Sequence, residues 1–266
     1  MDPANVLRAL DVQLREHARP DGPGGQVERV GEVVRQTAPP HGWNGVLWSR
    51  LTEDTADAAI AAQVRHFASL GREFEWKLYS HDTPADLGDR LRAAGFVPEP
   101  AETLMVAEAG TVATEPALPE GIRLHTVTDP AEVHLVATAH ELAFGTEASR
   151  LAHQLREQLA QRPDEITIVV ALAGDQPVCA ARMELCPGTE FAGLWGGGTA
   201  PAWRGRGIYR ALVAHRARIA AARGYRYLQV DASDDSRPIL TRLGFTALSV
   251  TTPYVYDPAP RRPLAP

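Results

Sequence analysis

The sequence predicts an α/β protein in which helices and strands are mixed along a chain of 266 residues. Three observations predict this class. In the second half, short apolar and β-branched runs alternate with amphipathic runs of helical length. Glycine and proline stand at the junctions of these runs, as turn residues do. Residues 110–120 are rich in proline and small residues and lack apolar periodicity, so we expect a linker between two domains.

The elements of the second half can be placed by their caps and turns. Asp129 and Pro130 suit the start of a helix. Residues 174–177 suit the turn of a hairpin, and Gly244 suits a helix end. The expected strands are 121–127, 165–173, 178–185, 191–199, 225–231 and one or two within 245–256, and the expected helices are 130–144, 149–162, 208–223 and 236–243.

The end of the first half repeats this order of elements. Strands at 74–79 and 102–106 flank a helix at 86–94. The residues Leu-Arg-Ala-Ala-Gly-Phe at 91–96 line up with Leu-Thr-Arg-Leu-Gly-Phe at 240–245. We interpret this as a weak internal repeat, although a helix-Gly-Phe-strand junction also recurs by chance in α/β proteins.

Composition and charge narrow the class of protein. The hydrophobic fraction of 44% and the charged fraction of 23% are typical of a globular protein. A net charge of −6 argues against a nucleic-acid binder, and no run is long enough to span a bilayer. Residues 1–20 have no apolar core and no cleavage signature, so we expect no secretory signal. Cys179 and Cys186 lack metal-binding spacing, so we expect free thiols, no metal and a cytoplasmic location.

A basic loop, Arg204-Gly205-Arg206-Gly207, lies between an expected strand and an expected helix. Unpaired backbone N–H groups at a helix N-terminus, the helix dipole and the conformational freedom of glycine together favour a bound phosphate. The loop therefore predicts a cofactor that carries a pyrophosphate. The alternative is an ordinary tight turn with solvated arginines.

The run from Thr199 to Tyr209 resembles the cofactor signature of the GNAT acetyltransferase superfamily, whose core is Q/R-x-x-G-x-G/A. Arg204 and Gly207 match two fixed positions, whereas Tyr209 stands where the family has glycine or alanine. Residues 243–245, Leu-Gly-Phe, resemble the same tripeptide after the family's fourth helix. The likeness covers residues 121–256 well and residues 1–106 only in their final third.

The resemblance implies the GNAT acyl-CoA N-acyltransferase fold, with a central mixed, mostly antiparallel sheet flanked by helices and a second, partial copy in the N-terminal half. The segment where the first copy should have its loop, residues 50–57, is acidic and has no glycine, so that copy is not expected to bind the cofactor. The expected organisation is a degenerate domain over 1–109, the linker 110–120, a catalytic domain over 121–258 and a tail over 259–266.

Acetyl-CoA is the acyl donor that the resemblance implies. The amides of residues 205–209 would hold the pyrophosphate, and the N–H of Thr199 would polarise the thioester carbonyl. The glycines before Thr199 suit a strand that a ligand approaches closely. The residues expected to bind the cofactor are Gly198, Thr199, Ala200, Pro201, Arg204, Gly205, Arg206, Gly207, Ile208, Tyr209, Ser233 and Ser236.

The resemblance implies the catalytic residues less directly. Acyl transfer to an amine needs a base for the ammonium and an acid for the thiolate. Family members often place a carboxylate base on the third or fourth strand, where this chain has Glu184 and Glu190, although both also suit solvated surface positions. Leu240 replaces the usual acid tyrosine. The possible substitutes are Tyr209, Tyr254 and Tyr256, of which Tyr254 stands with Glu184 and Glu190 as the candidate catalytic set.

The sequence thus predicts an N-acetyltransferase that moves an acetyl group from acetyl-CoA to a primary amine of a small molecule, by direct attack in a ternary complex. Two alternatives stay open. The missing tyrosine fits a CoA-binding sensor without turnover. Two-copy members of the superfamily, such as mycothiol synthase, transfer other acyl or aminoacyl groups. We expect no nucleic-acid or membrane partner, and a monomer or a homodimer.

Overall fold

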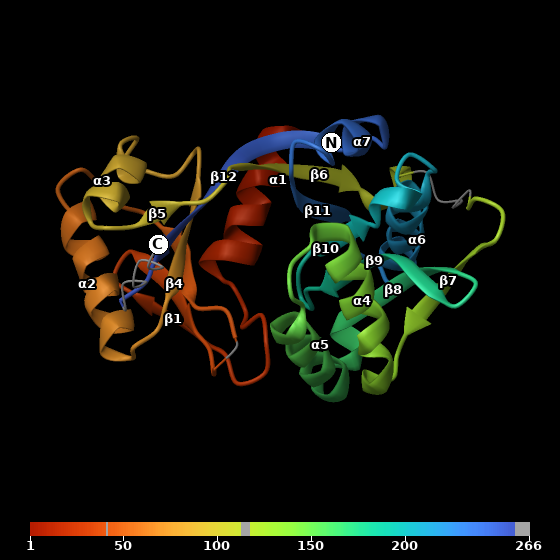
Figure 1. The fold of residues 1–266 in the computed structure, drawn as a ribbon. Coiled ribbons are helices and arrows are strands. Elements are labelled where there is room, and N and C mark those ends of the chain that lie inside the picture. The colour runs from red at the N-terminus through yellow and green to blue at the C-terminus, as the bar shows by residue number, and fades with distance from the viewer. Residues whose placement is uncertain (41, 113–117, 259–266) are drawn as a thin grey trace. The chain divides into compact units, whose positions relative to one another are not determined.

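The computed structural model describes residues 1–40, 42–112 and 118–258 (Figure 1). By contacts it forms two compact units: unit 1 is Met1 with Leu104–Leu248, and unit 2 is Asp2–Thr103 with Ser249–Pro266. Residues 113–117 of the expected linker and the expected tail 259–266 lie outside the described residues. Within the described ranges, no helix has the length and apolar composition of a membrane span.

Unit 1 contains a mixed, mostly antiparallel sheet, which confirms the predicted fold class. Its strands follow the order β6-β11-β10-β9-β8-β7. The strands from β7 to β10 are antiparallel to their neighbours, and β10 runs parallel to β11. The strand bounds are β6 Glu102–Glu108, β7 Ile122–Val127, β8 Ile166–Ala173, β9 Gln176–Leu185, β10 Phe191–Thr199 and β11 Tyr227–Ala232.

Helices cover both faces of this sheet, and β8 shows why its sequence is apolar throughout. Ile168 and Val170 pack in the cluster that contains α4 and α5 side chains, whereas Val169 and Ala171 pack with α6. Successive residues of a strand face opposite sides, so a strand covered on both faces is apolar without alternation. The helices of unit 1 are α4 Val133–Phe144, α5 Ser149–Gln161, α6 Ile208–Ala222 and α7 Arg237–Arg242, with 3-10 turns η2 Ala109–Thr111, η3 Pro130–Glu132, η4 Pro163–Glu165 and η5 Pro201–Trp203.

Unit 2 is a smaller sheet in the order β1-β2-β3-β4-β12, with β5 also paired to β12. Only β3 and β4 form a parallel pair among the pairings described for this unit. Its core is aromatic, with Phe67 stacked on Phe74 at a ring distance of 4.2 Å. The elements are α1 Pro3–Leu10, the π-helical η1 Asp11–Glu16, β1 Gln26–Val30, β2 Val33–Thr37, β3 Gly45–Ser49, α2 Ala56–Ser69, β4 Phe74–Tyr79, α3 Leu87–Ala93, β5 Val97–Pro98 and β12 Thr246–Tyr256.

Each unit is completed by a strand from the opposite half of the sequence. Most of β6 belongs to unit 1, although it precedes the expected linker. The part of β12 from Ser249 onward belongs to unit 2, where Thr251 lies opposite Tyr79 of β4. The two contact units therefore have other bounds than the expected domains 1–109 and 121–258. The interpretation of those two ranges as copies of one repeat stays a prediction.

Candidate cofactor and acceptor site

The parallel strands β10 and β11 form a fork in unit 1. Their pairing runs from Phe191 opposite Tyr227 to Gly193 opposite Gln229. Both strands continue beyond this point, β10 to Thr199 and β11 to Ala232. On its other edge β10 has a register shift against β9 between Trp195 and Gly198, and such irregularities bend a strand. We call the region beyond Gly193 the C-terminal fork.

Three consecutive glycines form the β10 arm of this fork, and each meets a different requirement. Gly196 has a φ of +59°, which disfavours any side chain. A Cβ on Gly197 would lie 2.6 Å from the ring of Tyr209. A Cβ on Gly198 would lie 2.5 Å from the ring of Phe144, at the end of α4. The glycine run therefore lets aromatic rings from two helices approach the backbone of β10.

The backbone N–H of Thr199 points into the C-terminal fork. Ala200 donates its N–H to the carbonyl of Val178 on β9 at 2.9 Å. Hydrogen-bonded and non-hydrogen-bonded pairs alternate along antiparallel strands, so the polar backbone groups of Thr199 face away from β9. The Thr199 hydroxyl instead donates to the Cys179 sulfur at 3.1 Å. The expected use of the Thr199 N–H toward an acyl group stays a prediction.

The loop between β10 and α6 has the geometry of an anion site. Gly205 and Gly207 both adopt left-handed conformations, with φ of +75° and +85°. Gly207 is the N-cap of α6 and, being glycine, supplies no side-chain acceptor to the N–H groups of the first turn. These N–H groups and the helix dipole therefore remain available to a negatively charged ligand.

The two arginines of the loop have different contacts. Arg204 donates from Nε to the carbonyl of Thr199 at 3.1 Å and from Nη2 to the carbonyl of Ala143 at 2.9 Å. It therefore ties the loop to the end of α4. Arg206 is exposed and lies over the ring of Trp203, 4.7 Å from its centroid. Their expected contacts with a pyrophosphate stay a prediction.

Tyr209, which departs from the family signature, turns its ring inward. The ring packs against Gly197 and the core cluster below α6. Burial raises the pKa of its hydroxyl. A large residue at a position that normally holds a small one is thus accommodated by a glycine on the facing strand. The Tyr209 ring therefore packs in the core, whereas Arg206 of the loop stacks on Trp203.

A buried arginine lies on the same helix face. Arg216 is 1% exposed and donates to the carbonyls of Leu212 at 3.1 Å and Arg182 at 2.7 Å. Among the described residues it forms no ion pair, and burial lowers its pKa to about 10. Burial also raises the pKa of the nearby Cys179 thiol to about 11, so this cysteine is a packing residue.

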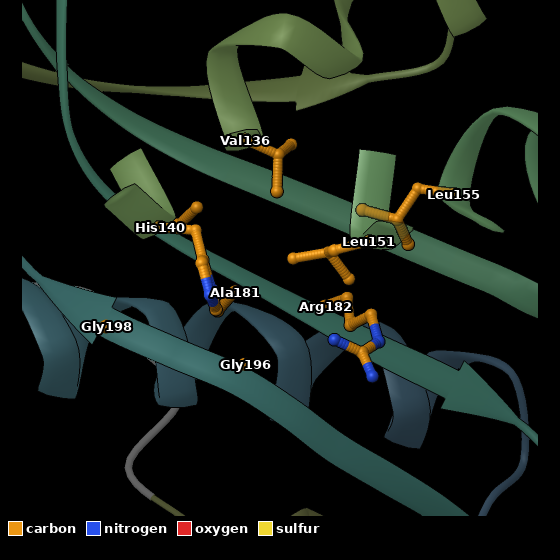
Figure 2. A pocket seen from close by; sticks show the side chains of 9 residues that line it. Val136, His140, Leu151, Leu155, Ala181, Arg182, Gly196 and Gly198 are labelled. Atoms are coloured by element: carbon orange, nitrogen blue, oxygen red, sulfur yellow. The ribbon is translucent and has the colours of Figure 1, made fainter. Parts of the chain in front are cut away.

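A pocket adjoins the C-terminal fork on the side of α4 and α5 (Figure 2). His140 and Arg182 are its polar residues. The His140 ring packs against Phe144 at a ring distance of 4.7 Å, and burial, with the charge of Arg182, lowers the pKa of the imidazole. Arg182 donates from Nε to Glu184 Oε1 at 3.2 Å. The full lining is Val136, His140, Leu151, Leu155, Ala180, Ala181, Arg182, Gly196 and Gly198.

Sequence reasoning did not find this pocket. Two signals were available for it. Arg182 and Glu184 stand two residues apart on a strand that is otherwise apolar, so both charges face one side. His140 lies four residues after Val136, on the helix face that the apolar residues define.

The expected catalytic residues are distributed over several places. Glu184 lies opposite Gly193, the last paired residue before the fork. Glu190 lies in the turn before β10, at the end of that strand remote from the loop, and pairs with Arg226 at 3.3 Å. Tyr254 is 3% exposed in the core of unit 2. Of the three, Glu184 is the one that the structure brings next to the fork.

The other fork arm carries the remaining predicted contacts. Ser233 and Ser236 follow β11 and bond to each other, with their hydroxyl oxygens 3.2 Å apart, at the start of α7. Leu240, at the position of the usual acid tyrosine, is fully buried in the core. The two arms of the fork thus end at the two segments that were expected to bind the cofactor.

Comparisons with known proteins agree with this geometry. Residues 133–245 match the sequence model of the "Acetyltransferase (GNAT) family". The fold is similar to a GCN5-related N-acetyltransferase from Kribbella flavida, at 20% identity and a TM-score of 0.66, covering 97% of this chain and 94% of that one. No curated protein matches the sequence significantly.

Two further solved structures have the same fold over nearly their whole length. A tandem GNAT protein from the clavulanic acid biosynthesis pathway is 14% identical with a TM-score of 0.60, covering 98% of this chain and 95% of that one. A GCN5-related N-acetyltransferase from Sphaerobacter thermophilus is 16% identical with a TM-score of 0.60 and the same coverage.

Proposed function

Because this chain belongs to the GNAT acetyltransferase family, we propose that it transfers an acetyl group from acetyl-CoA to the primary amine of a small molecule. One observation carries the proposal. The β10 arm of the C-terminal fork ends in a loop with two left-handed glycines at an uncapped helix N-terminus, and Gly196 and Gly198 of the same arm line a pocket with ionisable side chains. In this proposal the loop binds the phosphates and the pocket binds the acceptor, and both belong to unit 1.

Acetyl-CoA supplies the activated acyl group. In this proposal the amides of residues 205–209 hold the pyrophosphate, and the pantetheine follows the glycine arm of β10. The N–H of Thr199 donates to the thioester oxygen, where negative charge develops during attack. The Thr199 donor is held in place by the pairing of β10 to β9 before the ligand binds.

Two groups near the fork can accept a proton from the acceptor ammonium. Glu184 is next to Gly193. His140 lines the pocket, and its lowered pKa favours the neutral imidazole, whose free ring nitrogen can accept a proton. An acid is less important, because a thiol leaves with a pKa of about 8.5 and needs little help. The loss of the usual tyrosine at Leu240 is therefore compatible with turnover.

The buried side chain of Leu240 also supports a second candidate function, a CoA-binding module without turnover. The two functions differ in one measurement. An enzyme releases thiol from acetyl-CoA when a suitable amine is added and forms an acetylated product of the expected mass. A sensor binds the cofactor without releasing it as free CoA.

The proposal is tested by calorimetry with acetyl-CoA, followed by thiol release over a panel of primary amines. We expect saturable binding of acetyl-CoA and amine-dependent thiol release. Absence of any heat or thermal stabilisation with acetyl-CoA would refute both functions. Binding without turnover over the whole panel would favour the sensor.

A further inference from the structure

We propose that the acceptor amine carries a carboxylate, which Arg182 binds in the pocket between α4, α5, β9 and β10. This inference rests on the proposed function, since it names the class of acceptor for the same site. The predicted acceptor is an amino acid with an apolar side chain, or another amine that carries a carboxylate and an apolar group.

The pocket lies against the β10 arm of the C-terminal fork. Gly196 and Gly198 belong both to the pocket lining and to the β10 arm of the C-terminal fork. A molecule in the pocket therefore lies against the strand along which the cofactor is proposed to run. It reaches that strand from the side of α4 and α5, opposite to the Tyr209 ring on α6.

The Arg182 guanidinium is the group in the pocket that can bind a carboxylate. Its Nε donates to Glu184, and within the described part of the chain the terminal Nη1 and Nη2 atoms have no protein acceptor. A Cβ on Gly196 would lie 3.0 Å from Nη1, so the guanidinium occupies the space that this glycine leaves open. The two Nη groups form an edge that matches the two oxygens of a carboxylate.

The rest of the pocket lining is largely apolar. Val136, Leu151 and Leu155 form an apolar wall, and Arg182 is the cation of the pocket lining. The Arg182 side chain is 23% exposed, and an ion pair with a ligand is stronger in such a partly enclosed site than in water. Figure 2 shows the Val136, Leu151 and Leu155 side chains of this wall, which favours an aliphatic group beside the carboxylate.

A negatively charged side chain, Glu184, lies beside Arg182. Glu184 Oε1 lies 3.2 Å from Arg182 Nε, so opposite charges are adjacent on one face of β9. An amino acid presents a carboxylate and an ammonium at a similar separation. The pair thus complements a zwitterion and places the ammonium next to Glu184, one of the two candidate bases.

The test compares three acceptors that differ in one group: L-leucine, L-leucinamide and 3-methylbutylamine, each at saturating acetyl-CoA. We expect leucine to have the highest kcat/KM, by about tenfold or more, as the loss of a charged hydrogen-bond pair implies. Arg182→Gln should remove this preference mainly through KM, and Arg182→Lys should keep part of it. Arg123→Gln, at an exposed arginine of β7, is the matched control.

Equal use of the three acceptors by the wild-type protein, or a preference that survives in Arg182→Gln, would overturn the inference. Failure of the proposed function is separate, because it shows as absence of acetyl-CoA binding by calorimetry. If no acceptor turns over, leucine and leucinamide are compared as ligands by calorimetry on wild type and Arg182→Gln. Carboxylate-dependent binding lost in the variant supports the inference, and its absence in the wild type contradicts it.

Discussion

Among the strand pairings described, each unit has a parallel pair that stops pairing before its strands end, and different groups occupy the space beyond the two pairs. In unit 1 the C-terminal fork opens beyond Gly193 and is lined by glycine. In unit 2, β3 and β4 pair at Gly45 opposite Glu75 and at Val46 opposite Trp76, and both strands then continue. We call this second region the N-terminal fork.

A side chain of the protein itself bridges the N-terminal fork. Arg15 donates from Nε to the carbonyl of Leu47 on β3 at 3.1 Å. Its guanidinium lies 3.7 Å from the ring centroid of Tyr79 on β4 and bonds both carboxylate oxygens of Asp82 at 2.7 and 2.8 Å. Arg15 thus occupies the backbone carbonyl and the carboxylate that a ligand in this fork could otherwise contact.

The loops that follow the two forks also differ, in glycine content and in charge. The loop to α6 contains Gly205, Gly207 and two arginines, whereas the segment from β3 to α2 contains Glu53 and Asp54 and no glycine. Strand, loop, helix and strand follow in the same order in both units. The comparison shows that this order alone does not make a cofactor site, because backbone freedom, charge and free space decide it.

The largest expected effect comes from removing the bridge of the N-terminal fork. Arg15→Ala should lower the free energy of unfolding by about 3–5 kcal/mol, because it leaves the buried Asp82 carboxylate without its partner. Denaturant unfolding, with hydrogen exchange to assign the loss to unit 2, measures this. Acetyl-CoA affinity should not change.

The control for this variant is Arg92→Ala, at an exposed ion pair with Asp89 on the same unit. That pair should contribute at most about 0.5 kcal/mol. Similar losses in both variants would mean that the bridge across the fork is not a special feature of unit 2.

The second effect tests whether the glycine at position 197 is needed to make room for the Tyr209 ring. Gly197→Ala should destabilise the protein by about 1–3 kcal/mol, because the new methyl overlaps the Tyr209 ring. The same substitution in a Tyr209→Ala background should cost much less. Thermal or denaturant unfolding of the wild type, the two single variants and the double variant gives the coupling free energy between the two positions. Additive effects would show that Gly197 does not make room for the Tyr209 ring.

The third effect concerns the loop that distinguishes the two forks. Gly207→Ala should weaken acetyl-CoA binding by about tenfold, since a left-handed alanine costs about 1–2 kcal/mol and displaces the first N–H groups of α6. Calorimetry measures the affinity. Gly31→Ala is the control, because Gly31 also has a positive φ, with open space around it, in unit 2. An equal loss of affinity in both would show that backbone strain alone was measured.

The smallest effect is a pH dependence of unit 1. Burial and Arg182 lower the pKa of His140 below 6.5, while the nearby Glu141 acts in the opposite direction. In the window just below 6.5 the unfolded chain binds more protons, so this contribution to stability is present above 6.5 and is lost as the pH falls. His140→Asn should flatten that part of the stability curve. His134→Asn, at an exposed position on α4, should leave the curve unchanged.

The elements of the second half could be predicted because their ends carry clear signals. The side chain of Asp129 accepts from the N–H of Ala131 at 2.8 Å, as a helix cap does, and Gly145 ends α4 in a left-handed conformation. The predicted and observed bounds of β10 coincide. The predicted end of the sheet within 245–256 is a single strand, β12.

Other features could not be read from local patterns. The prediction assigned no element before residue 74, although α2 buries Ala56, Ile60, Gln63 and Phe67 at helical spacing. The assignment of β6 to unit 1 and of most of β12 to unit 2 depends on which strands pair. The local sequence of a strand does not determine which other strand it pairs with. The pocket combines residues from α4, α5, β9 and β10, so only the fold brings Arg182 and His140 together.

The position of β12 has a consequence for how the chain acquires its structure. Unit 2 needs residues from Ser249 onward, and its strand β4 pairs with a partner that is about 170 residues later in the sequence. During synthesis the first hundred residues therefore emerge long before the strand that completes their sheet. Folding of the N-terminal unit has to wait for the last part of the chain, and a fragment that stops at the linker exposes an unpaired edge of β4.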